Sequence, residues 1–175
     1  MTGLPVKEQY FFNCTLCGEC CRGDMSVFLN PKDLYKMAVY LGFSESRRLF
    51  TDSWVELVSG QNGMPVPKIR FRKAIIEFCP FLINELDDDD RLTGKCSLHP
   101  DRKPLICSLS PLAREVDVSD GSSVYSLIEP APECPGMNTP KANRLSENIS
   151  RLQDELTCEL RFYRILNRLR ENGYV

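Results

Sequence analysis

Cysteine content is the feature that most constrains how this chain can fold. The chain has 175 residues and nine cysteines, and the odd number argues against a framework in which every thiol is paired in a disulfide. Four of the nine lie together in the segment Cys14-Thr-Leu-Cys17-Gly-Glu-Cys20-Cys21. In a reducing compartment, thiols that are numerous and closely spaced are more often metal ligands or redox groups than structural bridges. The cysteines therefore favour a metal site over disulfides.

The remaining composition is that of a small globular protein. Lys and Arg number 22 against 24 Asp and Glu, and no basic arm or face indicates nucleic-acid binding. The N-terminus lacks the apolar run of a signal peptide, and no stretch approaches the roughly 20 apolar residues that span a bilayer. We therefore expect one domain over residues 1–175, located in the cytoplasm, with neither nucleic acid nor membrane as a partner.

The spacing of the first cysteines predicts which metal is bound. A Cys-x-x-Cys loop directs both sulfurs to one point, and thiolates bind soft metals strongly. Cys14, Cys17 and Cys20 have the spacing of the first three ligands of the bacterial ferredoxin run, which ends in a Cys-Pro pair. This chain offers two such pairs, Cys79-Pro80 and Cys134-Pro135. The pattern predicts iron, held as an iron–sulfur cluster of the 4Fe–4S type, with zinc as the main competing metal.

Eight cysteines are candidate ligands, and the ninth is not. Cys158 lies on the apolar side of a predicted helix, so we expect it to be a small core residue. Neighbouring side chains point in different directions, which argues against one cluster using both Cys20 and Cys21. Eight thiols suffice for two four-sulfur sites, or for one cluster with additional thiols around it, and the sequence leaves both open. The predicted metal-binding residues are Cys14, Cys17, Cys20, Cys21, Cys79, Cys96, Cys107 and Cys134.

The order of these motifs resembles the YkgJ-like cysteine cluster family. The resemblance runs from about Cys14 to Cys134, and its motifs are the Cys14–Cys21 cluster, Cys79-Pro-Phe-Leu, Gly94-x-Cys96-x-Leu-His-x-x-Arg102 and Pro104-x-x-Cys107-x-x-x-Pro111. It implies a zinc- or iron-chelating domain, often one with an iron–sulfur cluster. The chain departs from the family pattern at His99, Lys103 and Ser108. Because the family usually has an aromatic residue at the first of these, we expect His99 to pack or to hydrogen-bond near the site, and not to bind metal.

Three functions follow as hypotheses. The first is a metal-binding protein with an electron-transfer, cluster-handling or metal-handling role. The second is lysine N-methyl transfer, because the family includes the flagellin lysine N-methylases, although no glycine-rich nucleotide loop after a strand is visible. The third is a zinc-stabilised interaction module. A protein partner or substrate, and whether the chain is an enzyme, stay open.

The residue pattern predicts an α+β domain that is small, irregular and stabilised by metal. A helix should begin at Asn30-Pro31 and end before Gly42, and a second helix should run from Ser44 to Gly60, giving an N-terminal helical hairpin. Short strands are expected at Met25–Leu29, Lys68–Arg72 and Ile75–Phe78, with hairpins over residues 85–96 and 116–127. Residues 100–111 should be irregular or a single turn, and one long C-terminal helix is expected over residues 141–172.

Overall fold

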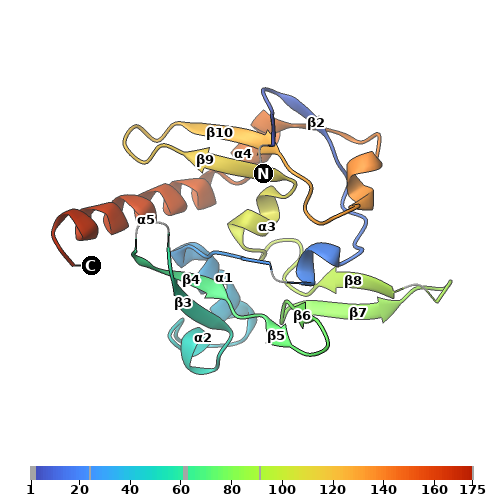
Figure 1. Ribbon diagram of the computed structural model, residues 1–175, viewed down its shortest axis with the longest axis horizontal. Coiled ribbons are helices and arrows are strands. Elements are labelled where there is room, and N and C mark those ends of the chain that lie inside the picture. Colours follow the sequence, from blue (N-terminus) through green and yellow to red (C-terminus); the bar gives the residue numbers. More distant parts are fainter. Residues whose placement is uncertain (1–2, 24, 61–62, 91, 175) are drawn as a thin grey trace.

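The computed structural model describes residues 3–23, 25–60, 63–90 and 92–174 (Figure 1). Helices and short strands are mixed along this part of the chain, and the α+β prediction is confirmed at that level. In chain order the elements are β1 (Leu4–Pro5), β2 (Gln9–Phe11), η1 (Glu19–Cys21), α1 (Pro31–Tyr40), α2 (Arg48–Thr51), β3 (Val55–Ser59), β4 (Pro65–Ile69), β5 (Arg72–Lys73), β6 (Glu77–Phe78), β7 (Leu82–Leu86), β8 (Leu92–Cys96), α3 (Leu105–Leu109), β9 (Leu112–Val116), β10 (Ser123–Leu127), η2 (Pro135–Asn138), β11 (Ala142–Arg144), α4 (Leu145–Arg151) and α5 (Gln153–Glu171).

The strands form small antiparallel sheets. Four of these sheets are pairs, β2–β11, β3–β4, β5–β6 and β7–β8, and the fifth has the order β1-β10-β9. The predicted hairpins over residues 85–96 and 116–127 are confirmed as β7–β8 and β9–β10. Strands β1 and β2 pair with β10 and β11, so the N-terminal segment is attached to the C-terminal part of the chain.

Helix α1 begins where the sequence predicts. The Asn30 side chain accepts hydrogen bonds from the backbone N–H groups of Lys32 and Asp33, and Pro31 occupies the first turn. The Asp33 carboxylate accepts a hydrogen bond from the Asn30 N–H in return. This reciprocal pair is a capping box, which satisfies N–H groups that have no partner inside the helix.

The predicted second helix is wrong beyond Thr51. Helix α2 ends there, Ser53 has a positive φ of 60°, and Val55–Ser59 is strand β3, paired with β4. Val55 lies opposite Ile69 of β4, and both side chains are buried in the first core. The apolar residues that match a helical stripe therefore belong to two different elements, and the helical hairpin is not formed.

The C-terminal helix is shorter than predicted. Residues 142–144 form β11, and the remaining residues divide into α4 and α5 at Leu152, which is buried. The pairing of β11 with β2 replaces the start of the predicted helix, and the non-helical backbone of Leu152, with φ −104° and ψ 11°, divides the rest. A long C-terminal helix is nevertheless present as α5.

Three shorter predictions have mixed outcomes. Residues 100–111 contain only the five-residue helix α3, as expected for a segment with three prolines. The strand predicted at Met25–Leu29 is reduced to a single bridge between Phe28 and Lys68. The strands predicted at Lys68–Arg72 and Ile75–Phe78 are replaced by the end of β4, by β5 and by the two-residue β6.

Two hydrophobic cores organise the molecule. The first surrounds α1, β3 and β4 and includes Cys79, with Cys21, Cys96 and Cys107 packed against it. The second lies between the β9–β10 hairpin and the helices α4 and α5. Helix α3 contributes to both cores, because Leu105 belongs to the second core and Cys107 packs against the first. Among the described residues, no helix has the length and hydropathy to cross a bilayer.

Candidate metal centre

The cysteine loop is held against strand β8 by two glycines. Gly18 has a positive φ of 76° and precedes η1, and the Cys21 N–H donates a hydrogen bond of 2.9 Å to its carbonyl. A Cβ atom on Gly94 would lie 2.5 Å from the Gly18 Cα, so the two backbones are in direct contact. The Gly94 N–H also donates to the Leu16 carbonyl at 2.8 Å. These contacts place Cys96, two residues further along β8, beside the loop.

Cys79 lies beside Cys21 because the two segments exchange backbone hydrogen bonds. The Cys79 N–H donates to the Cys21 carbonyl at 2.8 Å, and the Gly23 N–H donates to the Glu77 carbonyl at 2.8 Å. Their thiols are hydrogen-bonded to each other, and the Cys21 thiol is also hydrogen-bonded to that of Cys20. Cys20, Cys21 and Cys79 thus form a continuous chain of thiols.

Helix α3 brings Cys107 to the same place. The Leu105 N–H at its start donates to the Asp33 carboxylate at 2.9 Å, which fixes α3 against the start of α1. The Cys107 thiol interacts electrostatically with the thiols of Cys21, Cys96 and Cys20.

Cys134 approaches the other side of the cysteine loop. The Asn13 N–H donates to the Gly136 carbonyl at 3.1 Å, which places the chain before Cys14 against the segment that carries Cys134. The Cys134 thiol interacts electrostatically with those of Cys17, Cys20 and Cys14. All eight predicted ligands are therefore connected through thiol–thiol interactions, and Cys20 is involved on both sides.

Burial and neighbouring thiols favour the protonated form of most of these cysteines. The hydrogen bond with Cys20 lowers the pKa of the Cys21 thiol, but the hydrogen bond with Cys79 and burial outweigh it and raise the pKa to about 12. The hydrogen bond with Cys21 raises the pKa of Cys20, and burial raises the pKa of Cys107. Such thiols lose their protons to a bound cation, because metal binding displaces protons from its ligands.

Several groups around the thiols lower the thiol pKa and so oppose the effect of burial. The pKa of Cys96 is raised by burial, but the backbone N–H groups of Leu98 and His99 donate hydrogen bonds to its sulfur and lower the pKa in part. The Gly136 N–H does the same for Cys134. The ammonium group of Lys103 acts on Cys20, Cys96 and Cys107 in the same direction. Donors and a positive charge directed at sulfur stabilise thiolates, the form that binds metal.

The donor set fits iron or zinc. All nine cysteines lie in described residues and none forms a disulfide, as the sequence predicts. Within the described part of the chain, no three His, Cys, Asp or Glu side chains are arranged to hold an ion as they stand. Binding therefore requires cysteine side chains to rotate toward a common point, which exposed Cys14 and Cys20 have room to do. Eight thiols with N–H donors are the soft ligands that both metals take in proteins.

Two residues outside the ligand set differ in part from the predictions, because His99 does not pack in the interior and Cys158 belongs to neither hydrophobic core. His99 is exposed, and its backbone N–H donates to the Cys96 carbonyl at 3.0 Å. Cys158 is half-buried on α5, a helix that contacts α1 and α4. The contribution of Lys103 to Cys20 and Cys96 was not predicted, because it depends on how separate segments meet. The N–H donors lie two or three residues after their cysteines, and their contribution depends on turn conformations that the cysteine spacing does not specify.

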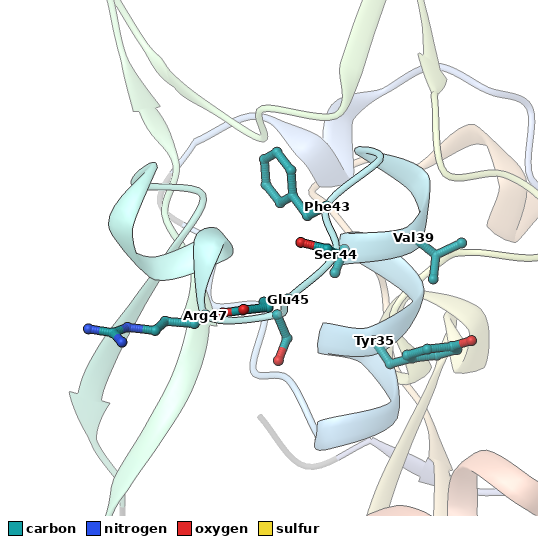
Figure 2. A pocket seen from close by; sticks show the side chains of 8 residues that line it. Tyr35, Val39, Phe43, Ser44, Glu45 and Arg47 are labelled. Atoms are coloured by element: carbon teal, nitrogen blue, oxygen red, sulfur yellow. The ribbon is translucent and has the colours of Figure 1, made fainter.

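One surface pocket is separate from the cysteines. It has a volume of about 550 Å³ and lies between α1 and the segment that leads to α2. Figure 2 shows Tyr35 and Val39 on α1, and Phe43, Ser44 and Glu45 on the segment that follows this helix. No cysteine lines this pocket, so it is not part of the candidate metal centre.

Comparison with known proteins supports the same interpretation. The model of the family CxxCxxCC, described as "Putative zinc- or iron-chelating domain", matches residues 13–135. This range includes all eight clustered cysteines and leaves out Cys158. No curated protein and no solved structure matches the chain. The match confirms the resemblance drawn from the order of the motifs. With eight thiols gathered in one region and most of its length matched, the chain belongs to the CxxCxxCC family of zinc- or iron-chelating domains.

Proposed function

We propose that this chain is a metal-binding protein that holds iron, as an iron–sulfur cluster of the 4Fe–4S type, on clustered cysteine thiolates. The observation that carries the proposal is the convergence of eight thiols from five separate parts of the chain. The proposed ligands are Cys14, Cys17, Cys20, Cys21, Cys79, Cys96, Cys107 and Cys134. Zinc is the competing metal, because the family chelates either ion.

The surroundings of the thiols support a role in electron transfer, cluster handling or metal handling. A bound iron–sulfur cluster supplies a site that gains and loses electrons at a potential set by its surroundings. The N–H groups of Leu98 and Gly136 and the Lys103 ammonium stabilise negative charge on sulfur. The first core excludes water from Cys79, whereas Cys14 stays accessible from solvent. A centre that is covered by the protein on one side and open to solvent on the other suits the exchange of electrons or metal with a partner.

Metal and sulfide analysis tests the proposal. The protein should be purified without oxygen, and iron, zinc and acid-labile sulfide should be measured per chain. We expect iron and sulfide in comparable amounts and a brown protein that absorbs near roughly 400 nm, as thiolate-ligated iron clusters do. The Cys158→Ala variant is the matched control and should give the same values. A colourless protein with stoichiometric zinc and no sulfide would establish the zinc alternative.

A zinc-stabilised interaction module is the second candidate. It is favoured by exposed apolar side chains on the two hairpins next to the cysteines, namely Ile75, Ile76, Ile83, Leu86 and Leu92. Exposed large apolar side chains are a feature of surfaces that contact another protein. The metal analysis above separates the two candidates. The lysine N-methyltransferase alternative rests on the family resemblance alone.

A further inference from the structure

We infer that the eight cysteines form two four-thiol metal sites, which divide between them the adjacent residues Cys20 and Cys21. The inference rests on the proposed function and specifies how the thiols are grouped. The inner site consists of Cys21, Cys79, Cys96 and Cys107. The outer site consists of Cys14, Cys17, Cys20 and Cys134.

The inner group is defined by a shared apolar environment. Cys79 belongs to the first hydrophobic core, and the other three inner cysteines are the ones that pack against this core. The Cys21 and Cys79 thiols are hydrogen-bonded, and the Cys21 thiol also interacts with that of Cys96. The Cys107 thiol interacts with those of Cys21 and Cys96. Four thiols from four segments therefore lie against one apolar core, and four is the number of thiolates in a closed tetrathiolate site.

The outer group is defined by its position around Cys134. The three thiols that interact with the Cys134 thiol are those of Cys17, Cys20 and Cys14, and each belongs to the N-terminal cysteine loop. The hydrogen bond from the Asn13 N–H to the Gly136 carbonyl holds this loop against the Cys134 segment. Cys14 and Cys20 are exposed, in contrast to the inner cysteines.

The adjacent pair sets the boundary between the sites. Cys20 and Cys21 are the last two residues of η1, and successive side chains on a 3₁₀ turn point in different directions. Cys20 also interacts with Cys96 and Cys107. We assign it to the outer site because it is exposed like Cys14, whereas Cys21 is hydrogen-bonded to buried Cys79. Because Cys20 and Cys21 are adjacent in sequence, two sites that use one each must lie close together.

The two sites should differ in how readily they exchange metal. The inner site lies against the first core, so a chelator reaches its metal only after local opening. The outer site has two exposed ligands and is open to a chelator or to a partner that carries thiols. The outer site is therefore the exchangeable one, and the inner site is the one that stabilises the fold.

Metal content in matched variants tests the grouping. Metal per chain should be measured, with the full-length protein purified anaerobically, in the wild type, in Cys134→Ser and in Cys96→Ser, with Cys158→Ser as the control. Each site variant should keep about half of the wild-type metal, and the control should keep all of it. The Cys96→Ser variant should also lose more thermal stability than Cys134→Ser.

A kinetic measurement on the wild type avoids dependence on variants that fold poorly. Release of metal to an excess of a chromogenic chelator should follow two phases of equal amplitude, and Cys134→Ser should lack the fast phase. A single phase in the wild type, together with complete loss of metal from both site variants, would overturn the two-site grouping while leaving the proposed function intact. A wild-type protein that contains neither iron nor zinc and takes up neither ion would instead overturn the proposed function.

Discussion

Asp33 shows how a single buried side chain positions part of the metal centre. It is 1% exposed, and its carboxylate accepts hydrogen bonds from the N–H groups of Asn30, which caps its own helix, and Leu105, at the start of α3. The Lys36 ammonium lies 3.4 Å from the carboxylate and donates to the Lys103 carbonyl at 2.7 Å. Burial raises the pKa of Asp33, and these donors reduce the shift. Asp33 therefore fixes the helix that carries Cys107.

Replacing Asp33 should destabilise the protein strongly. In Asp33→Ala two buried N–H groups lose their acceptor, and we expect the free energy of unfolding to fall by about 3 kcal/mol. Denaturant unfolding measures the change. The control is Asp154→Ala, which removes an exposed carboxylate 3.7 Å from Lys32 and should change stability by about 0.5 kcal/mol or less. Similar losses in both variants would contradict the role assigned to Asp33.

Cys158 and Cys17 should respond differently to the same substitution. Cys158→Ala removes a half-buried sulfur from α5, so the metal content should be unchanged and stability should fall by about 1 kcal/mol. Cys17→Ala removes a thiolate from the cysteine loop and should lower the metal content. Elemental analysis of the two proteins, prepared side by side, checks the assignment, which fails if Cys158→Ala loses as much metal as Cys17→Ala.

The sequence identifies the candidate ligands but not their environment. Cysteine spacing is local, so Cys14, Cys17 and Cys20 stand out at once, and the Cys-Pro pairs extend the pattern. The donors to Cys96 and Cys134 are backbone N–H groups, which every residue except proline has, and Lys103 is one lysine among many basic residues. The role of Lys103 follows from the folded positions of separate segments, and that of the N–H groups follows from the conformation of the turns after Cys96 and Cys134.

At the scale of elements, the β7–β8 hairpin and η1 form one unit. Gly18 and Gly94 touch through their backbones, and no side chain fits between them. The Arg22 guanidinium crosses the same boundary, donating to the Cys17 carbonyl at 3.0 Å and to the Asn84 side chain at 2.8 Å. The position of Cys96 relative to the cysteine loop therefore depends on this contact.

A methyl group at Gly94 should separate the hairpin from the loop. The added Cβ would lie 2.5 Å from the Gly18 Cα, which is backbone and cannot rotate away. We expect Gly94→Ala to lose about 1–3 kcal/mol of stability, as overpacked positions do, and to retain less metal. Calorimetry and metal analysis measure the two effects. Lys95→Ala, at the neighbouring exposed position, is the control and should retain wild-type metal; unchanged metal in Gly94→Ala would show that the contact is dispensable.

Helices and strands were predictable where a local sequence pattern is enough to determine them. The capping residues before α1 and the turn-rich hairpins act over a few residues, and both were identified correctly. The segment from Ser44 to Gly60 contains apolar residues that satisfy a helical period, but β3 forms because β4 offers it a pairing partner. Pairing of this kind overrides local propensity and is not visible in the segment itself.

At the scale of the whole molecule, metal removal should affect the two cores unequally. The first core contains or contacts four cysteines, whereas no cysteine belongs to the second core or to the side chains packed against it among the described residues. Removing the metal with a chelator should therefore reduce amide protection in β7–β8 and η1 and leave β9–β10 and α5 largely protected. Hydrogen exchange before and after chelation measures this, and uniform loss of protection across both cores would contradict it.

The way in which distant strands pair was the part of the structure that the sequence predicted least. The general class of the fold and its long C-terminal helix follow from hydrophobic periodicity. The pairing of β1 with β10 and of β2 with β11 joins residues from opposite ends of the chain, and strands of two or three residues carry too little pattern to indicate a partner.

The pairing of β2 with β11 also determines when the cysteine loop can reach its folded position during synthesis. Translation proceeds from the N-terminus, so the thiols of Cys14 to Cys21 leave the ribosome well before Cys134 and the strand that anchors their segment. At roughly 5–20 residues per second, about ten seconds separate the two events. Throughout that interval the earliest thiols lack their C-terminal neighbours. A centre that uses both Cys14 and Cys134 is thus completed only after residues 142–144 have also been made.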